Sequence, residues 1–302
     1  MNIQSPCNDC PRHCNVVRPE TNASEKTIPG YCHSPLQPIV ARAALHYWEE
    51  PCISGTKGSG TIFFTGCNLR CCFCQNTAIS RSGKQGKQIT TQRLQQIYKE
   101  LIIQGAHNIN LVTPTPYIRA IIKSLDSPLP VPVVYNCGGY ETTETITALQ
   151  GKIQIYLPDF KYMDTSLGST YSMVSDYPEI AEKAILQMYK QVGPYELDEQ
   201  GILKKGLIIR HLILPNCLDN TKRVIDWVAS HFKEGQVLFS LMRQYTPYGN
   251  AYKYPEINRS LTAREYNKAE QYLFDSGIED GFVQEKNSAS KMFIPSFDGT
   301  GV

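Results

Sequence analysis

The sequence lacks several features that would assign it to a common class. Among its 302 residues, no apolar run approaches the roughly 18 residues that a membrane-spanning helix needs. The opening residues, MNIQSPCNDC, are polar and contain no apolar segment of a secretion signal. The formal net charge is only +2, so the chain carries no strong basic field for nucleic acid or an anionic membrane. We therefore expect a cytoplasmic protein that binds neither nucleic acid nor membranes.

Two further absences narrow the kind of site. Residues 55–60, GTKGSG, lack the G-x4-G-K-[ST] pattern of a phosphate-binding loop and precede a strand-like run, so they favour a connector. Eleven cysteines occur without a secretion signal, which indicates a reducing compartment. Thiols there bind metal or stay free. The cysteines are therefore the first candidates for a functional site.

Three cysteines follow an apolar run, residues 62–65, that is β-branched and aromatic and ends at Gly66. In the spacing C-x3-C-x2-C, they are Cys67, Cys71 and Cys74. Three thiolates can hold three irons of a [4Fe–4S] cluster and leave the fourth iron open to a small molecule. A zinc ribbon usually needs a second cysteine or histidine pair, and the next cysteine is Cys137. The triplet therefore predicts a catalytic iron–sulfur cluster, with Cys72 beside it as a non-ligand.

A second group of four cysteines stands near the start, in the pattern C-x2-C-x3-C-x17-C. They are Cys7, Cys10, Cys14 and Cys32. Their segment is too polar to fold around a core of its own, and four thiolates would close a metal site without an open position. We predict a metal-stapled module with a structural or electron-relay role. The spacing leaves zinc and a second iron–sulfur cluster equally open.

The rest of the chain alternates between strand-like and helix-like segments. Strands are expected at residues 62–65, 109–113, 131–136, 155–159, 207–214 and 237–242, with a short last one at 281–285. Helices are expected at residues 34–50, 91–105, 116–125, 142–149, 177–193, 219–232 and 262–277. Residues 194–206 are typical of a small hairpin, and Thr262 with Glu265 of a capping box. Six strands alternating with helices predict a parallel α/β sheet, either doubly wound or closed as a barrel.

Polar residues and glycines stand where the apolar runs end. Because the carboxyl ends of parallel strands meet at one edge, reactive side chains should gather there. The candidates at these ends are Thr113, Thr115, Asn136, Asp159, Lys161 and Arg210. We expect them to form one site that faces the cluster.

These motifs resemble those of the radical S-adenosylmethionine superfamily, in the branch related to the pyruvate formate-lyase activating enzyme. The resemblance covers about residues 61–285 and rests on the cysteine triplet, with Phe73 before the third cysteine, and on Asp159-Phe160-Lys161. Stretches such as LPDFKYMD and the closing IPSFDGTGV are similar to uncharacterised iron–sulfur proteins of the activating-enzyme type. The resemblance implies a partial (β/α)6 TIM-like barrel with a C-terminal extension over residues 51–302. A cysteine-rich module and a linking helix over residues 1–50 would precede it.

The resemblance further implies a radical enzyme, an oxidoreductase of the glycyl-radical activase type. S-adenosylmethionine would bind to the open iron of the [4Fe–4S] cluster and be cleaved reductively to methionine and a 5′-deoxyadenosyl radical. An electron donor such as flavodoxin or ferredoxin would be a partner. Phe73 would lie near the adenine, and Thr113 to Thr115 would replace the family's glycine-glycine-glutamate segment at the methionyl amino group.

The same resemblance assigns the remaining contacts. Asn136 would lie near the ribose or the methionyl end of the cofactor. Lys161 would pair with the methionyl carboxylate, and Asp159 would orient it or help to hold a monovalent cation. Arg210 is a candidate for the ribose or the carboxylate.

The residues leave the target of the radical open. By resemblance, the target is a glycine in a partner glycyl-radical enzyme. One alternative is the same chemistry on a small metabolite or a peptide side chain. In a different class, the chain would be a non-catalytic iron–sulfur electron carrier, but carriers usually ligate all four irons with protein side chains.

Overall fold

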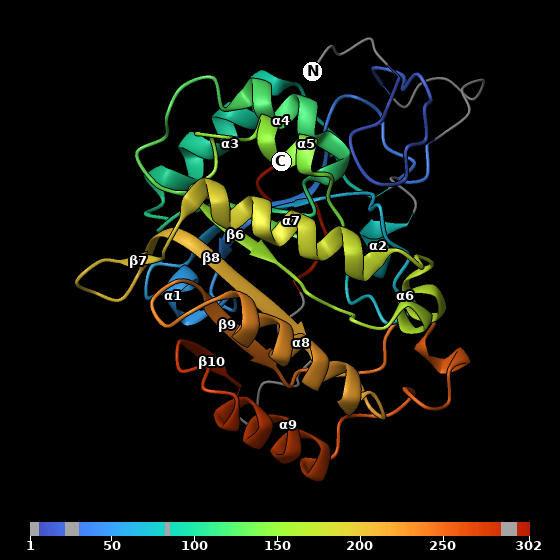
Figure 1. Cartoon of the computed structure of the whole chain (residues 1–302). Helices are drawn as coiled ribbons and strands as arrows, with labels where there is room; N and C mark the ends of the chain where they lie inside the picture. The colour runs from blue at the N-terminus through green and yellow to red at the C-terminus, as the bar shows by residue number, and fades with distance from the viewer. Residues whose placement is uncertain (1–5, 22–29, 82–84, 285–294) are drawn as a thin grey trace.

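The structure is a computed structural model that describes residues 6–21, 30–81, 85–284 and 295–302. At its centre seven strands run parallel in the spatial order β10-β9-β8-β6-β5-β4-β2, of which Figure 1 labels β10, β9, β8 and β6. These strands are β2 (Ser59–Phe64), β4 (Ile109–Val112), β5 (Val133–Cys137), β6 (Ile155–Pro158), β8 (Leu203–Leu212), β9 (Leu238–Met242) and β10 (Gly281–Val283). The sequence predicts all seven. Glu285, the last residue of the strand expected at 281–285, lies outside the described residues.

Helices alternate with the parallel strands. The longer ones are α3 (Thr91–Ile103), α4 (Ile118–Ser124), α5 (Thr143–Ala148), α6 (Thr165–Ser172), α7 (Tyr177–Val192), α8 (Leu218–His231) and α9 (Ala263–Asp275). Short elements are α1 (Pro51–Ser54), α2 (Thr77–Ser80), η1 (Thr115–Tyr117) and η2 (Ala251–Lys253). The pairs α3–α4, α5–α7 and α8–α9 lie side by side (Figure 1), and the predicted capping box of Thr262 and Glu265 opens α9. Within the described residues no helix combines the length and the apolar composition needed to cross a membrane.

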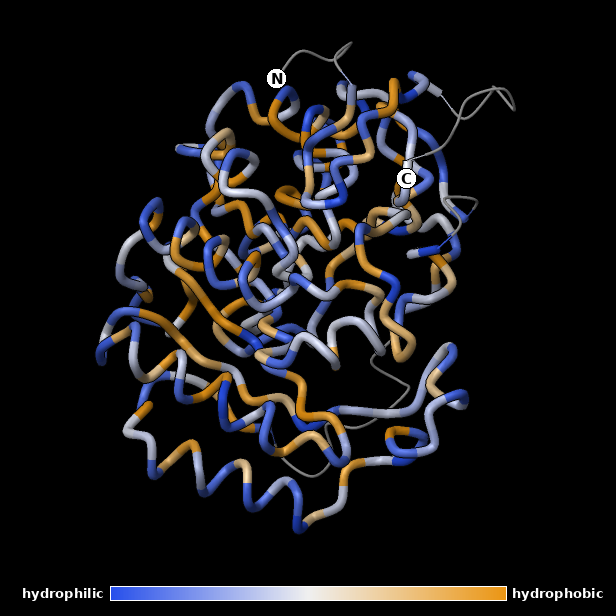
Figure 2. The backbone as a smooth tube through the Cα atoms, turned by 45° about the vertical axis from the view of Figure 1, so that its right-hand side comes forward, coloured by the Kyte–Doolittle hydropathy of each residue, from blue (hydrophilic) through white to orange (hydrophobic). Residues whose placement is uncertain are grey.

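The main core lies between the sheet and these helices. Hydrophobic and hydrophilic positions alternate along the helices in Figure 2, because every third or fourth residue of such a helix faces the sheet. On α3 the inward residues include Leu94 and Tyr98, and on α7 they include Ile185 and Met188; all four are fully buried. The helices are therefore held by the same periodic positions from which the sequence predicts them.

A second apolar cluster fills the concave side of the parallel strands. Its buried members are Cys52, Ile53, Val134, Ile155, Leu157, Leu203, Ile208 and Leu238. The first two come from α1, which closes the interior at one end. Inward-facing side chains alternate along each strand, and toward the carboxyl ends the inward positions become polar. They are Asn136, Asp159, Arg210 and Ser240. The partial barrel expected from the resemblance is thus confirmed, and its interior changes from apolar to polar toward the strand ends.

The linking helix expected over residues 34–50 is wrong. Its central part, Ile39–His46, forms strand β1, which runs antiparallel to β2. Strand β1 also pairs with β3 (Lys87–Gln88) and bonds to the C-terminal residues, where the Ala43 N–H donates to the Thr300 carbonyl at 2.9 Å. The run IVARAALH has apolar residues in succession, so its pattern fits either a helix or a strand. The backbone groups along the edge of β2 needed partners, and that tertiary demand decided for a strand.

The small hairpin expected at residues 194–206 is confirmed. Strand β7 (Glu196–Leu197) pairs antiparallel with β8, with Glu196 opposite Lys205. Because this pairing extends β8 toward its start, the strand begins at Leu203 and not at residue 207. The hairpin lies at the end of the sheet away from the polar layer, so it has no part in the candidate site.

Candidate functional site

The cysteine triplet lies in the loop that follows β2. Gly66, at a φ of +77°, ends the strand, and a Cβ there would stand 2.8 Å from the Cys32 carbonyl oxygen. Only glycine accepts both the positive φ and this close approach. The turn therefore starts the cysteine loop and also lets the N-terminal module pack against it.

Each sulfur of the triplet has a polar neighbour. The Leu69 N–H donates to Cys67 Sγ at 3.4 Å, and the Ser172 hydroxyl donates to Cys71 Sγ at 3.0 Å. Cys74 Sγ lies 3.6 Å from Ser80 Oγ. Hydrogen bonds to the sulfurs are one of the ways in which proteins tune iron–sulfur clusters. Burial raises the pKa of the Cys67 and Cys74 thiols, so these groups need a bound cation to persist as thiolates at neutral pH. This donor set fits a [4Fe–4S] cluster.

Lys161 and Asp159, both predicted from the sequence, lie beside the triplet. Lys161 Nζ is 2.6 Å from Asp159 Oδ2, and this ion pair is largely buried. Burial alone would lower the pKa of Lys161, but Asp159 and the sulfur of Cys71 raise it above its ordinary value. Burial would likewise raise the pKa of Asp159, yet Arg210 and Lys161 hold it below its ordinary value. The lysine is thus a fixed cation next to the sulfurs.

Arg210 joins the polar side chains of the barrel interior. Its guanidinium lies 2.7 Å from Asn136 Oδ1 and 2.9 Å from Asp159 Oδ1. The Nη1 of Arg210 lies 3.2 Å from Glu49 Oε2, and the Asn136 amide donates to Glu49 Oε1 at 3.2 Å. The structure therefore brings together three of the predicted site residues. It also engages Arg210 with protein groups, leaving only the Nε of this side chain without a hydrogen bond.

Sequence reasoning missed two acidic residues of this layer. Glu49 takes part in the network, and Glu50, which is buried, accepts a hydrogen bond from Ser240 at 3.0 Å. Burial raises the pKa of Glu50. The expected helix over residues 34–50 hid both, because a strand ending at His46 sends the next residues into the barrel. Two adjacent acids directly before Pro51 were the only signal.

A buried amide without a hydrogen-bond partner faces the same interior. Asn110 is fully buried in β4, and neither atom of its amide has a hydrogen-bond partner. Its register neighbour Val134 belongs to the apolar cluster inside the barrel, so the two side chains share that face. An unpaired buried amide costs free energy unless a water or a ligand joins it.

The other residues predicted to contact the cofactor are bonded to, or packed against, other residues of the protein. Thr113 has a φ of +58°, and its N–H donates to the Asn136 carbonyl at 2.9 Å. The Thr115 hydroxyl donates to Glu141 Oε1 at 2.6 Å. Phe73 is buried and lies edge-on to Tyr245, with 5.8 Å between ring centroids. Their roles toward a cofactor stay predictions.

Glu141, which directly precedes the cap of α5, is fully buried between Thr115 and Tyr135. Burial raises the pKa of its carboxyl to about 8, although these two hydrogen bonds lower it. The folded protein therefore keeps this proton up to about pH 8, whereas the unfolded chain loses it near pH 4.5. Between these values stability should fall as pH rises, by about 1.4 kcal/mol per pH unit from this group alone.

We expect Glu141→Gln to remove this fall, because glutamine can keep both hydrogen bonds without a proton to lose. Anaerobic urea unfolding at pH 5, 6.5 and 8 measures it. Glu144→Gln, a change at an exposed position of α5, is the matched control and should follow the parent protein. An unchanged slope in Glu141→Gln would contradict the assignment.

The N-terminal cysteine module packs directly against the cysteine loop. Arg12 Nε donates to the Asn68 carbonyl at 2.8 Å, and Arg70 donates to the Tyr31 carbonyl at 2.8 Å. The guanidinium of Arg12 stacks on Tyr31 at 3.7 Å. A buried ion pair between Asp9 and Arg119, 2.7 Å apart, anchors the module to α4. The module and the triplet thus form one continuous region.

Within the module, Arg18 is buried and its guanidinium lies 3.9 Å from Cys7 Sγ. The Tyr31 N–H donates to Cys14 Sγ at 3.3 Å. A buried guanidinium beside the sulfurs matches the net negative charge that four thiolates bring to a zinc or iron–sulfur centre. In the described part of the chain, no three histidine, cysteine or carboxylate side chains are arranged to hold a metal ion. The metal at Cys7, Cys10, Cys14 and Cys32 stays a prediction.

Known proteins resemble this chain in sequence and in fold. No protein-family model matches the sequence. It is 33% identical to the uncharacterised protein MJ0674 of Methanocaldococcus jannaschii over 288 residues, 91% of this chain and 77% of that protein. Among solved structures it is similar to HydG, a maturase of the [FeFe]-hydrogenase, with a TM-score of 0.50 and 15% identity over 78% of this chain and 53% of that one. Methylornithine synthase (PylB) gives a TM-score of 0.49 at 13% identity, over 86% and 72% of the two chains. The chain therefore has a fold similar to that of HydG and belongs to the family of the Methanocaldococcus jannaschii protein.

Proposed function

We propose that this protein is an enzyme that cleaves S-adenosylmethionine reductively to start radical chemistry. One observation carries the proposal. The three cysteines after β2 lie beside a buried Lys161–Asp159 pair at the carboxyl end of β6. When bound, a [4Fe–4S] cluster would supply the electron that splits the sulfonium into methionine and a 5′-deoxyadenosyl radical. Cys67, Cys71 and Cys74 would hold the cluster.

The protein's own residues would bind and orient the cofactor. Lys161 is a fixed cation at the site, so it suits the carboxylate of the methionyl group, and Asp159 keeps it in place. Arg210 and Asn136 hold one another in the same polar layer, and their hydrogen-bonding groups are suited to the ribose hydroxyls. The apolar cluster below this layer would keep water from the buried side of a cofactor bound there.

The proposal also includes the target of the radical and the source of the electron that reduces the cluster. On the resemblance alone, the radical would be passed to a glycine of a partner protein, and a flavodoxin or ferredoxin would supply the electron. A small metabolite or a peptide side chain is the competing target. Incubation with candidate glycyl-radical proteins, scored by the doublet in electron paramagnetic resonance, separates these targets.

The test of the core proposal is direct. The protein is reconstituted anaerobically with iron and sulfide, reduced with dithionite and incubated with S-adenosylmethionine. We expect 5′-deoxyadenosine and methionine in equal amounts. A cluster-replete preparation that forms neither would sink the proposal and leave the electron-carrier alternative.

A separate prediction concerns the N-terminal cysteines. Replacing Cys7 and Cys10 with alanine should remove one metal centre while the triplet keeps its cluster, because the two sets use different sulfurs. Iron and zinc analysis of the variant shows which metal was lost. If neither metal falls, the prediction of a metal-stapled module is wrong.

A further inference from the structure

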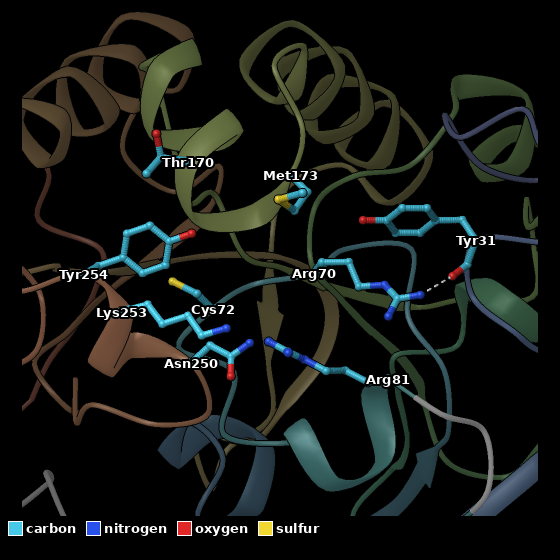
Figure 3. A pocket seen from close by; sticks show the side chains of 9 residues that line it. All are labelled: Tyr31, Arg70, Cys72, Arg81, Thr170, Met173, Asn250, Lys253 and Tyr254. Atoms are coloured by element: carbon cyan, nitrogen blue, oxygen red, sulfur yellow. Dashed lines mark hydrogen bonds between the residues drawn. The ribbon is translucent and has the colours of Figure 1, made fainter.

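A cavity of about 390 Å³ opens beside the cysteine loop. Its lining residues come from the N-terminal module, the loop, α2, α6 and the region of η2 (Figure 3). They are Tyr31, Arg70, Cys72, Arg81, Thr170, Met173, Asn250, Lys253 and Tyr254. Three of them are cations, and none is a carboxylate. In Figure 3 the polar ends of Arg81, Asn250 and Lys253 point toward the same space.

The three cations of this cavity, Arg70, Arg81 and Lys253, lack a carboxylate partner in direct contact in the described part of the chain. Among the described residues, the Arg70 guanidinium contacts the carbonyl and the ring of Tyr31, and the buried Nε of Arg81 has no hydrogen-bond partner. The cavity is thus a local concentration of positive charge on a chain whose net charge is only +2.

The cavity lies against the backbone of the cluster loop. Arg81 donates to the Cys71 carbonyl at 3.3 Å. The Cys72 N–H donates to the Tyr171 carbonyl at 2.8 Å, and the Cys72 carbonyl accepts from the Asn250 N–H at 2.7 Å. These bonds clamp the peptide next to a predicted cluster ligand. Cys72, which lines the cavity, directly follows Cys71 in the chain. An electron that arrives in the cavity therefore reaches the residue next to a predicted cluster ligand.

Two exposed side chains with apolar surface lie beside these cations. Met173, in a left-handed backbone conformation at the end of α6, is 60% exposed, and Tyr252, next to Lys253, is 63% exposed. Arginine, methionine and tyrosine are enriched in protein interfaces. A small anion would neutralise the cations but leave Met173 and Tyr252 in water, whereas a protein surface would cover both.

We propose that this cavity and its rim are the docking surface of an acidic one-electron donor protein, of the low-potential flavoprotein or ferredoxin class. This proposal rests on the proposed function, which needs one electron for each cleavage. One electron leaves the reduced donor, which is oxidised by one unit, and the cluster of this protein is reduced by one unit. No bond is made and no proton moves in that step. The three cations steer the acidic donor to the face of the cysteine loop where Arg70 and Cys72 line the cavity.

The experiment compares two reductants on the same holoenzyme. The reconstituted parent protein and the variant Lys253→Glu are given S-adenosylmethionine and either reduced flavodoxin or dithionite, at low salt. The variant Lys253→Gln provides a second comparison if Lys253→Glu does not load its cluster. A matched control, Lys268→Glu, makes the same charge change at an exposed position of α9.

With flavodoxin we expect the initial rate of 5′-deoxyadenosine formation to fall about tenfold or more in the cavity variants and to stay unchanged in Lys268→Glu. Raising the salt to 0.5 M should lower the parent rate toward that of the variants, because exposed charges are then screened. With dithionite the rates of all proteins should agree within about twofold.

Equal flavodoxin rates in parent and cavity variants would overturn the docking surface. So would inhibition by millimolar phosphate or citrate of the dithionite-driven reaction, because the cavity would then be a small-anion site. No product with dithionite in the parent protein refutes the proposed function instead.

Discussion

Replacing Cys71 by alanine is expected to reduce 5′-deoxyadenosine formation to the background rate. Cys71 is the middle cysteine of the triplet, and its sulfur accepts a hydrogen bond from Ser172. With two thiolates left, a [4Fe–4S] cluster would lack a ligand on a second iron and would be labile in the absence of a replacement. Iron content, the visible absorbance of the cluster and product formation after anaerobic reconstitution all measure the effect.

The adjacent residue provides a matched control. Cys72 is buried but belongs to the wall of the basic cavity and not to the triplet. Cys72→Ala removes one thiol from the same loop, so it should keep the cluster and the dithionite-driven activity. If Cys72→Ala lost the cluster and Cys71→Ala kept it, the assignment of the three ligands would be wrong.

Arg210→Met is expected to destabilise the fold by about 3–5 kcal/mol, the cost of leaving partners of a buried ion pair uncompensated. The change removes the cation shared by Glu49 and Asp159, both of which are largely buried. Asp159 keeps Lys161, whereas Glu49 keeps only the amide of Asn136. Urea unfolding of the variant at pH 7 measures the loss.

The pH dependence tests the physical origin of that effect. Because Arg210 holds the pKa of Asp159 below its ordinary value, this carboxylate stabilises the fold above about pH 4 and loses that contribution as the pH falls further. Arg210→Met should therefore be closest to the parent protein in acid and furthest from it at neutral pH. Arg93→Met, which breaks the exposed pair with Glu100, should cost about 1 kcal/mol or less. An Arg210→Met variant as stable as Arg93→Met would show that the network does not hold the barrel interior together.

The sequence by itself determined the elements whose patterns are local. Leu94, Ile97, Tyr98 and Leu101 recur at helical spacing and predict α3, and Thr262 with Glu265 predicts the start of α9. Asp159 and Lys161 could be assigned to one site because parallel strands must end at the same edge. The triplet needed only the spacing of three cysteines in one short loop. All these inferences depend on residues close together in the chain or on one rule of topology.

Tertiary structure decided the features for which the local sequence pattern fits more than one structure. The run from Ile39 to His46 forms a strand because β2 needed a partner for its free edge. As a result, the side chains of Glu49 and Glu50 point into the barrel interior. The carboxyl of Glu141 acquired its buried position from Thr115, 26 residues away, which no helical pattern encodes. The basic cavity is assembled from segments as distant as Tyr31 and Lys253. Charges that far apart in the sequence meet only through the fold, because the Coulomb energy depends on distance in space and not on distance along the chain.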